Sequence, residues 1–209
     1  MSRHAKPPVK RNRSAVLPAG VAYMLVVGLF LAVALGVWLL VFSTKAPAVA
    51  VNCERPDTGE AVSATSLAGE PLLAPRDIAV RVLNANGEAG QATELSEYLQ
   101  ALGFARPEVA PVDNDPLTPN QDLNCFGQLR FGPDFVTQPA TLHSLFPCFE
   151  LVQDARTDPS VDVVLGEGFQ GFSDSASVRR ALTSLNNGEE IPRESLGALT
   201  TTACLHSTN

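Results

Sequence analysis

The chain has 209 residues, of which 45% are apolar, so it can form one ordinary domain with additional segments. Its net charge of -7 is unevenly distributed, because six of the 15 basic residues lie before residue 46, where no acidic residue occurs. The rest of the chain carries nine basic residues against 22 acidic ones. An acidic surface repels phosphates, which argues against nucleic acid as its partner.

The basic and acidic parts are separated by an apolar segment, Val21 to Phe42, that contains no charged residue. Its 22 residues are enough for a helix to cross a bilayer core, which takes about 20. Basic residues precede the segment and only Lys45 follows it closely, so the N-terminus should be cytoplasmic and the body exported. The alternative is a cleaved signal peptide, since small residues at 46–50 resemble a cleavage site. The apolar core is longer than signal peptides usually have, which favours an uncleaved anchor.

Four segments follow from this pattern. They are a basic cytoplasmic segment at 1–20, a transmembrane helix at 21–42 in the plasma membrane, an extracytoplasmic tether at 43–75 and a domain at 76–209. Within the span, Gly28, Ala32 and Gly36 repeat every four residues, and small residues on one face allow two helices to approach closely. A transmembrane dimer, or pairing with another membrane protein, is one reading. The other is the ordinary glycine and alanine content of such spans.

Apolar periodicity predicts alternating strands and helices in the domain. Strands are expected at 78–83, 107–112, 125–132, 148–156 and 161–166, the last of them nearly all apolar and therefore central. Helices are expected at 92–102, before Gly103; at 133–146, kinked or starting late because of Pro139; and at 174–188, capped by Ser173 or Asp174. The order predicts an α+β fold, an α/β sandwich in which helices pack on one mixed sheet.

The turn after the first strand, "NANGEAGQ" at 84–91, lies where nucleotide-binding proteins hold phosphate. It contains neither a GxGxxG nor a Walker sequence, and Glu88 would compete with an anion for the helix amides. We expect a structural turn instead, with Asn86 capping the helix and Gly87 in a conformation that favours glycine.

Four cysteines, Cys53, Cys125, Cys148 and Cys204, lie in the part that should be exported. None forms a CxxC pair, so a metal site has little support, and an even number in an oxidising compartment favours two disulfides. Sequence alone allows three connectivities. If the strands that begin near Cys125 and Cys148 are parallel neighbours, those two cysteines start at the same end of the sheet and can bond. Cys53 would then pair with Cys204.

Other polar residues give weaker signals. His143 and His206 have no nearby acid and nucleophile that form a triad, so both are interpreted as structural. The acids Asp154, Asp158 and Asp162 lack the spacing of a calcium loop and suggest a solvated turn. No catalytic residue, metal or cofactor is predicted.

One strand face offers a binding hypothesis. With strict alternation, Phe126, Gln128 and Arg130 share a face that could stack on a sugar or receive a carboxylate. The same face could equally be an ordinary solvent face whose arginine pairs with nearby acids.

Several segments together carry a family resemblance: "VRVLNANGEAGQATELSEYLQALGF", "GQLRFGPDF", "CFELVQDAR" and "VDVVLGEGF". Over residues 76–169 they resemble the LytR C-terminal domain, with the remainder to 209 as a C-terminal extension. With the anchor and four cysteines, the chain is similar to single-pass actinobacterial envelope proteins that carry one such domain. The resemblance implies a role in keeping the envelope intact. LytR-CpsA-Psr ligases have a larger catalytic domain for which this chain has no room, so their activity is not implied.

Two functions remain as hypotheses. The first is a non-catalytic module, anchored in the membrane, that binds wall glycan or an envelope protein. The second is an enzyme, or an accessory subunit, of cell-wall glycopolymer ligation, which would need arginine and aspartate side chains converging on one pocket. A cavity faced by both Arg130 and Asp154 would favour the second.

Overall fold

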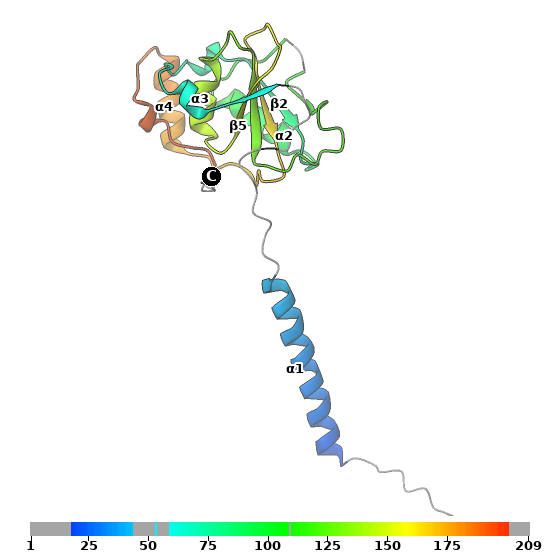
Figure 1. The fold of residues 1–209 in the computed structure, drawn as a ribbon. Coiled ribbons are helices and arrows are strands. Elements are labelled where there is room, and N and C mark those ends of the chain that lie inside the picture. The colour runs from blue at the N-terminus through cyan, green and yellow to red at the C-terminus, as the bar shows by residue number, and fades with distance from the viewer. Residues whose placement is uncertain (1–17, 44–52, 54–58, 109, 201–209) are drawn as a thin grey trace, which may run out of the picture. The chain divides into compact units, whose positions relative to one another are not determined.

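The computed structural model describes residues 18–43, 53, 59–108 and 110–200 (Figure 1). The chain divides into two compact units, Met1–Ala48 and Val49–Asn209. In the first unit one helix, α1 (Ala19–Ser43), covers the apolar segment of the sequence. The second unit holds all the strands and the other helices.

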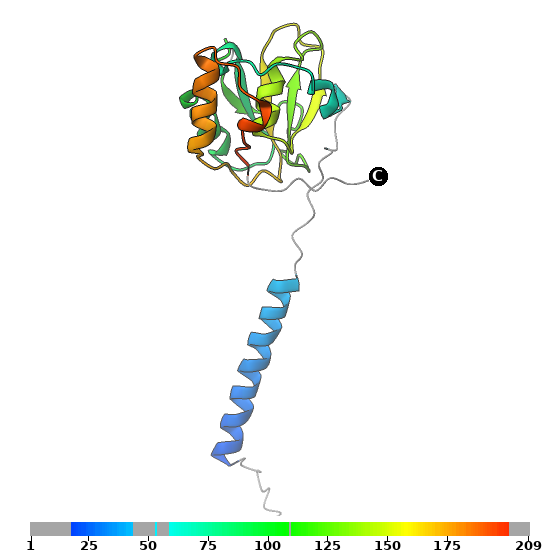
Figure 2. The same ribbon diagram turned by 90° about the vertical axis from the view of Figure 1, so that its left-hand side faces the viewer.

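The second unit is built on one six-stranded mixed sheet, as the sequence predicted (Figure 2). The strands lie in the order β1-β5-β4-β6-β2-β3, with β1 antiparallel to β5, β4 antiparallel to β6, and the remaining neighbours parallel. Their bounds are β1 (Glu60–Val62), β2 (Val80–Asn84), β3 (Val112–Asn114), β4 (Gly127–Phe131), β5 (Glu150–Gln153) and β6 (Val161–Leu165). All five residues of β6 are buried, which confirms its central position.

Three α-helices cover one face of this sheet. They are α2 (Gln91–Ala101), α3 (Gln138–Leu145) and α4 (Ala176–Asn186), and short 3-10 helices occur at η1 (Ala64–Leu67), η2 (Pro75–Asp77) and η3 (Arg193–Ser195). Each α-helix buries an apolar stripe against alternate strand residues such as Val82, Leu129 and Val163. Because alternate strand residues point to opposite faces, the residues between them lie on the other face.

The helix boundaries follow from local chemistry. α2 is followed by Gly103 with φ 98°, the left-handed conformation that the sequence predicted after its last turn. α3 starts late, with Pro139 in its first turn, where the missing N–H costs no helical hydrogen bond. The predicted cap of α4 was wrong, because Ser175 is the N-cap and its hydroxyl accepts from the Val178 amide at 3.4 Å.

Two predicted segments differ from the structure. Part of the expected tether belongs to the domain, since β1 pairs with β5 at the sheet edge and Leu67 of η1 is 1% exposed in the core. The sequence did not predict β1, because an edge strand of three residues needs few apolar side chains. The strand expected at 107–112 lies further along the chain, as β3, and shares only Val112 with the prediction.

Candidate functional site

Charged and polar side chains gather on the sheet face opposite the helices. Cross-strand pairing places Asp162 of β6 beside both Arg130 of β4 and Arg81 of β2, and Gln128 beside Glu150 of β5. We call this group the charged face and define it by Arg81, Asp115, Gln128, Arg130, Glu150, Asp154, Arg156 and Asp162. Most of these side chains are buried, which is unusual for charged residues unless they are paired.

Arg130 at the centre of the charged face is fully engaged. Its two terminal nitrogens donate to the two carboxylate oxygens of Asp115 at 2.7 and 2.9 Å, and its Nε donates to Gln128 Oε1 at 2.9 Å. The side chains of Arg130 and Asp115 are only 3% and 0% exposed. Asp115 comes from the loop after β3 and also accepts from the Thr118 hydroxyl at 2.8 Å. A ligand could reach the Arg130 guanidinium only by displacing this loop.

A second cluster lies beside it on the same face. Asp162 accepts from Arg81 at 2.8 and 2.7 Å and from Arg156 at 2.7 Å, and Arg156 also donates to Asp154 at 2.6 Å. Burial disfavours the Asp162 carboxylate, but the hydrogen bonds and charges of Arg81 and Arg156 outweigh it and lower its pKa. Burial likewise opposes the Arg156 cation, while its two aspartate partners raise the pKa above the ordinary arginine value. The cluster is therefore an ionised, mutually neutralised network at neutral pH.

The predicted binding face was partly wrong, because Phe126 does not lie with Gln128 and Arg130. Phe126 packs in the core under the helices. The backbone at Gly127, with φ 154°, breaks the strict alternation on which the prediction rested. A Cβ there would collide with the Val164 carbonyl and lie 2.6 Å from the Phe149 ring, so only glycine fits at this first position of β4.

The predicted disulfide pairing was also wrong, because Cys53 bonds to Cys125 with their Cα atoms 4.9 Å apart. β4 and β5 are parallel neighbours, as expected. However, Cys125 lies on the charged-face side with Leu83 and Val164, while Cys148 lies in the helix-side core. Opposite faces of one sheet cannot be joined by a disulfide. Cys148 is disulfide-bonded as well, and Cys204 lies outside the described residues.

The turn at 84–91 is held by its own side chains. The Asn84 carboxamide oxygen accepts from the amides of Asn86 and Gly87, and Gly87 has φ 74°, as predicted. The expected cap was wrong, because α2 begins later, after Gly90. Asn86 donates instead to Gln91 and to the Gly166 carbonyl, which ties the turn to the end of β6. These contacts give the turn a structural role.

The acidic residues of the β5–β6 connection and of the start of β6 are held by protein partners. Asp154 and Asp162 bind arginine, and Asp158 accepts from the amide and hydroxyl of Ser160. Within the described part of the chain, no three residues of the histidine, cysteine and acidic types are placed to hold a metal ion.

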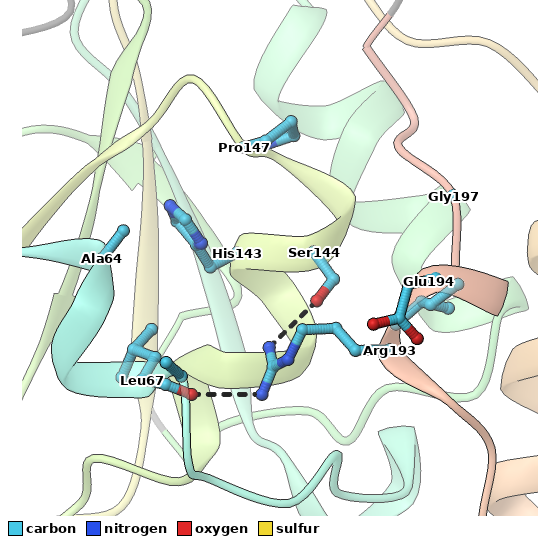
Figure 3. Close-up of a pocket in the computed structure, with 10 residues that line it drawn as sticks. Ala64, Leu67, His143, Ser144, Pro147, Arg193, Glu194 and Gly197 are labelled. Carbon is cyan, nitrogen blue, oxygen red and sulfur yellow. Dashed lines mark hydrogen bonds between the residues drawn. The ribbon is translucent and has the colours of Figure 1, made fainter.

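A cavity of about 450 Å³ lies between η1, α3 and η3 (Figure 3). His143 of α3 contributes to its wall and is half-buried, and burial followed by the charge of Arg193 lowers the pKa of the imidazole. No sequence pattern pointed to this cavity, because its walls come from three segments far apart in the chain. His206 lies outside the described residues.

The small residues Gly28, Ala32 and Gly36 fall on α1, and no neighbouring atom lies within 4 Å of a Cβ built at either glycine. Among the residues described here, no helix was found that is long and apolar enough to cross a membrane.

A comparison with known protein families identifies the type of domain that carries the charged face. Residues 77–169 match the family model described as LytR cell envelope-related transcriptional attenuator, which is the LytR C-terminal domain. The segment begins just before β2 and ends after β6, so it contains every residue of the charged face. The strand β1 and the helix α4 lie outside it.

Two relatives are similar over more of the chain. The cell envelope integrity protein Cei of Mycobacterium tuberculosis is 34% identical over an alignment of 204 residues, which covers 92% of this chain and 89% of that protein. The solved soluble domain of a conserved hypothetical secreted protein from Mycobacterium marinum is 34% identical, with a TM-score of 0.59, and the match covers 68% of this chain and 95% of that one. The chain belongs to the Cei family of envelope integrity proteins.

Proposed function

We propose that this protein is a non-catalytic, membrane-anchored envelope protein whose exported domain supports envelope integrity by binding wall glycan or another envelope protein. The observation that carries the proposal is the similarity to Cei across nearly the whole of both chains. Because the match covers 92% of this chain, it extends well beyond the domain, which supports an organisation shared by the two proteins.

Single-span anchoring is part of the proposal. It is supported by the uncharged stretch from Val21 to Phe42 and by the helix α1 that covers it. Large apolar side chains such as Leu29, Phe30 and Leu31 are 65–71% exposed on α1, which is costly in water and favourable in lipid. The bases before the segment favour a cytoplasmic N-terminus, and the Cys53–Cys125 disulfide fits an exported domain.

A binding role fits the charged face better than catalysis does. Glycopolymer ligation would need arginine and aspartate side chains that converge on a cavity. Arg130 instead binds Asp115, and Asp154 binds Arg156, and neither residue lines any of the four cavities of the domain that we describe. The paired arginines and aspartates therefore stabilise the sheet, and a partner would bind the exposed surface around them.

Complementation tests the proposal. In a host that lacks its own relative, the full chain should restore resistance to detergent, and the same domain exported without residues 1–45 should restore it less. Purified oxidised 46–209 should bind saturably to peptidoglycan, arabinogalactan or solubilised membrane proteins. Turnover of a glycopolymer substrate by this fragment would contradict the non-catalytic assignment. Full activity of the unanchored domain would contradict the anchor.

Helix pairing through Gly28, Ala32 and Gly36 is a separate part of the proposal. Replacing Gly28 and Gly36 by leucine should lower self-association or partner capture in detergent. Replacing Val27 and Ala34 by leucine is the control, because at 3.6 residues per turn these positions lie on the other side of the helix and leave the small face intact. Equal association of both variants would remove the pairing from the proposal.

A further inference from the structure

The cavity between η1, α3 and η3 has features that the envelope role does not explain. Its volume of about 450 Å³ lies in the range of small-molecule pockets. Its walls combine apolar side chains, including Leu67, Pro147 and Leu196, with the polar groups of His143, Arg193 and Glu194. Such a mixture of apolar walls and few polar groups is typical of a site that orients a small ligand.

Arg193 places a positive charge at the wall that no carboxylate neutralises. Its terminal nitrogens donate to the carbonyls of Ala140, Leu67 and Glu70 and to the Ser144 hydroxyl, at 2.6–3.2 Å. Figure 3 shows the bonds to Leu67 and Ser144. These acceptors are neutral, and within the described part of the chain Arg193 forms no ion pair, although Glu194 follows it directly. The four bonds fix the guanidinium in position, so its charge acts from a fixed point on whatever enters the cavity.

His143 supplies a free hydrogen-bonding group in the same wall. In Figure 3 its imidazole extends from α3 on the side where Ala64 and Leu67 of η1 lie. Its ring forms no hydrogen bond with any described residue. The titratable side chains that line the cavity with His143 are Arg193 and Glu194 from η3, whereas the lining residues of η1, Ala64 and Leu67, carry no titratable group. Burial and the Arg193 charge keep the imidazole neutral at pH 7, able to donate through one nitrogen and accept through the other.

We propose that this cavity binds a small carboxylate attached to a short apolar group. The carboxylate would lie near the Arg193 charge and accept from His143, and the apolar group would contact Ala64, Ala68 and Pro147, which are the exposed apolar residues of the wall. A phosphate is a poorer fit, because its larger charge and hydration suit several free donors, and the Arg193 donors are already occupied. The site is independent of the envelope role proposed above.

Titration of His143 tests the site directly. The 46–209 fragment, which corresponds to the soluble domain solved for the M. marinum relative, contains two histidines, so its imidazole NMR signals are few. The probes are N-acetyl-D-alanine, N-acetyl-L-alanine and hexanoate, with N-acetylalanine methylamide as the neutral control. Each bound carboxylate should raise the His143 pKa, because an anion offsets the repulsion from Arg193.

The three probes separate the possible sources of the carboxylate. Preference for the D-enantiomer indicates a wall peptide, preference for the L-enantiomer indicates a protein C-terminus, and preference for hexanoate indicates a fatty acid. No saturable shift with any of them at tens of millimolar, or an equal shift with the neutral amide, overturns the proposal.

Two variants make the test specific. Glu194→Gln removes the negative charge from the cavity wall and should tighten carboxylate binding about threefold. Glu189→Gln removes an equal charge outside this cavity and should change binding little. His143→Gln should weaken binding while the fold, followed by amide spectra, is kept. Identical affinities for the two glutamate variants would overturn the proposed position of the carboxylate.

Discussion

The two faces of the sheet are both buried but are stabilised in different ways. The helix-side face packs buried apolar side chains of the four inner strands against α2, α3 and α4, and Val62 and Val112 of the edge strands are partly buried against this core. None of the described α-helices packs on the opposite face, which buries arginines and aspartates that neutralise each other, together with a small apolar cluster around the Cys53–Cys125 disulfide. Apolar packing tolerates many exchanges of similar volume, whereas a buried ion pair fails when one partner is removed. The charged face should therefore be the more sensitive to single polar substitutions.

The largest effect is expected at Asp115. Asp115→Ala leaves the Arg130 guanidinium buried without its bidentate partner, and breaking a buried pair costs about 4 kcal/mol. The free energy of unfolding of the oxidised 46–209 fragment, measured in urea, should fall by that amount. Asp113→Ala, which removes an exposed carboxylate two residues earlier in β3, is the matched control and should change it little. Similar losses for both variants would show that the pair is not what stabilises this face.

The disulfide comes next. Cys53→Ser with Cys125→Ser opens a link across 72 residues, and loss of such a link costs about 3 kcal/mol. The unfolding midpoint should fall accordingly. Digestion without reduction followed by mass spectrometry should recover the Cys53 and Cys125 peptides joined. A recovered Cys125–Cys148 peptide would contradict the assignment of these cysteines to opposite faces.

The next prediction concerns Gly127, the residue at which the alternation of side chains between the two faces of the sheet is broken. Gly127→Ala forces a Cβ into the Val164 carbonyl and the Phe149 ring, and should cost about 2 kcal/mol more than Gly171→Ala. Gly171 also has a positive φ, of 113°, but no atom lies within 4 Å of its added Cβ. Both substitutions strain the backbone, so the difference between the two thermal unfolding midpoints measures the steric clash at Gly127. Equal losses would leave no role for the crowding at Gly127.

The smallest expected effect concerns pH. The pKa of Asp162 is lowered in the folded state, so its contribution to stability is present above the unfolded value of about 4 and is lost as the pH falls through the folded pKa. Asp162→Asn removes the charge but keeps an oxygen that can accept from the arginines, so it should cost about 2 kcal/mol at pH 7 and less in acid. Urea unfolding of both proteins between pH 7 and pH 3 measures this difference. A constant gap over that range would contradict the ionised network.

Much of the helix-side architecture could be predicted because its signals are local. The stripe of α2, the late start of α3 at Pro139 and the continuous apolar run of β6 each follow from neighbouring residues. The mixed sheet followed from the order of these elements. Edge strands were harder, since β1 and β3 have three residues each and little apolar content.

The charged face could be predicted only in part. Gln128 and Arg130 stood out because polar residues alternate with apolar ones in β4. Asp115 binds Arg130 in one cluster, and Arg156 binds Asp162 in the other. Both lie in loops, where such residues are common and carry no periodic signal. The cavity around His143 and Arg193 gave no signal, because the two residues are distant in sequence.

The sequence by itself determined the separation of a basic, apolar N-terminal part from an acidic domain, the helices, the central strands and the resemblance to the LytR C-terminal domain. These properties depend on composition and on spacing within one segment. Only the tertiary structure decided which cysteines bond, which acid neutralises Arg130 and on which side Phe126 lies. The physical reason is that one irregular residue, Gly127, reverses the side of its neighbours, and that loop residues find their partners only when distant segments pack together.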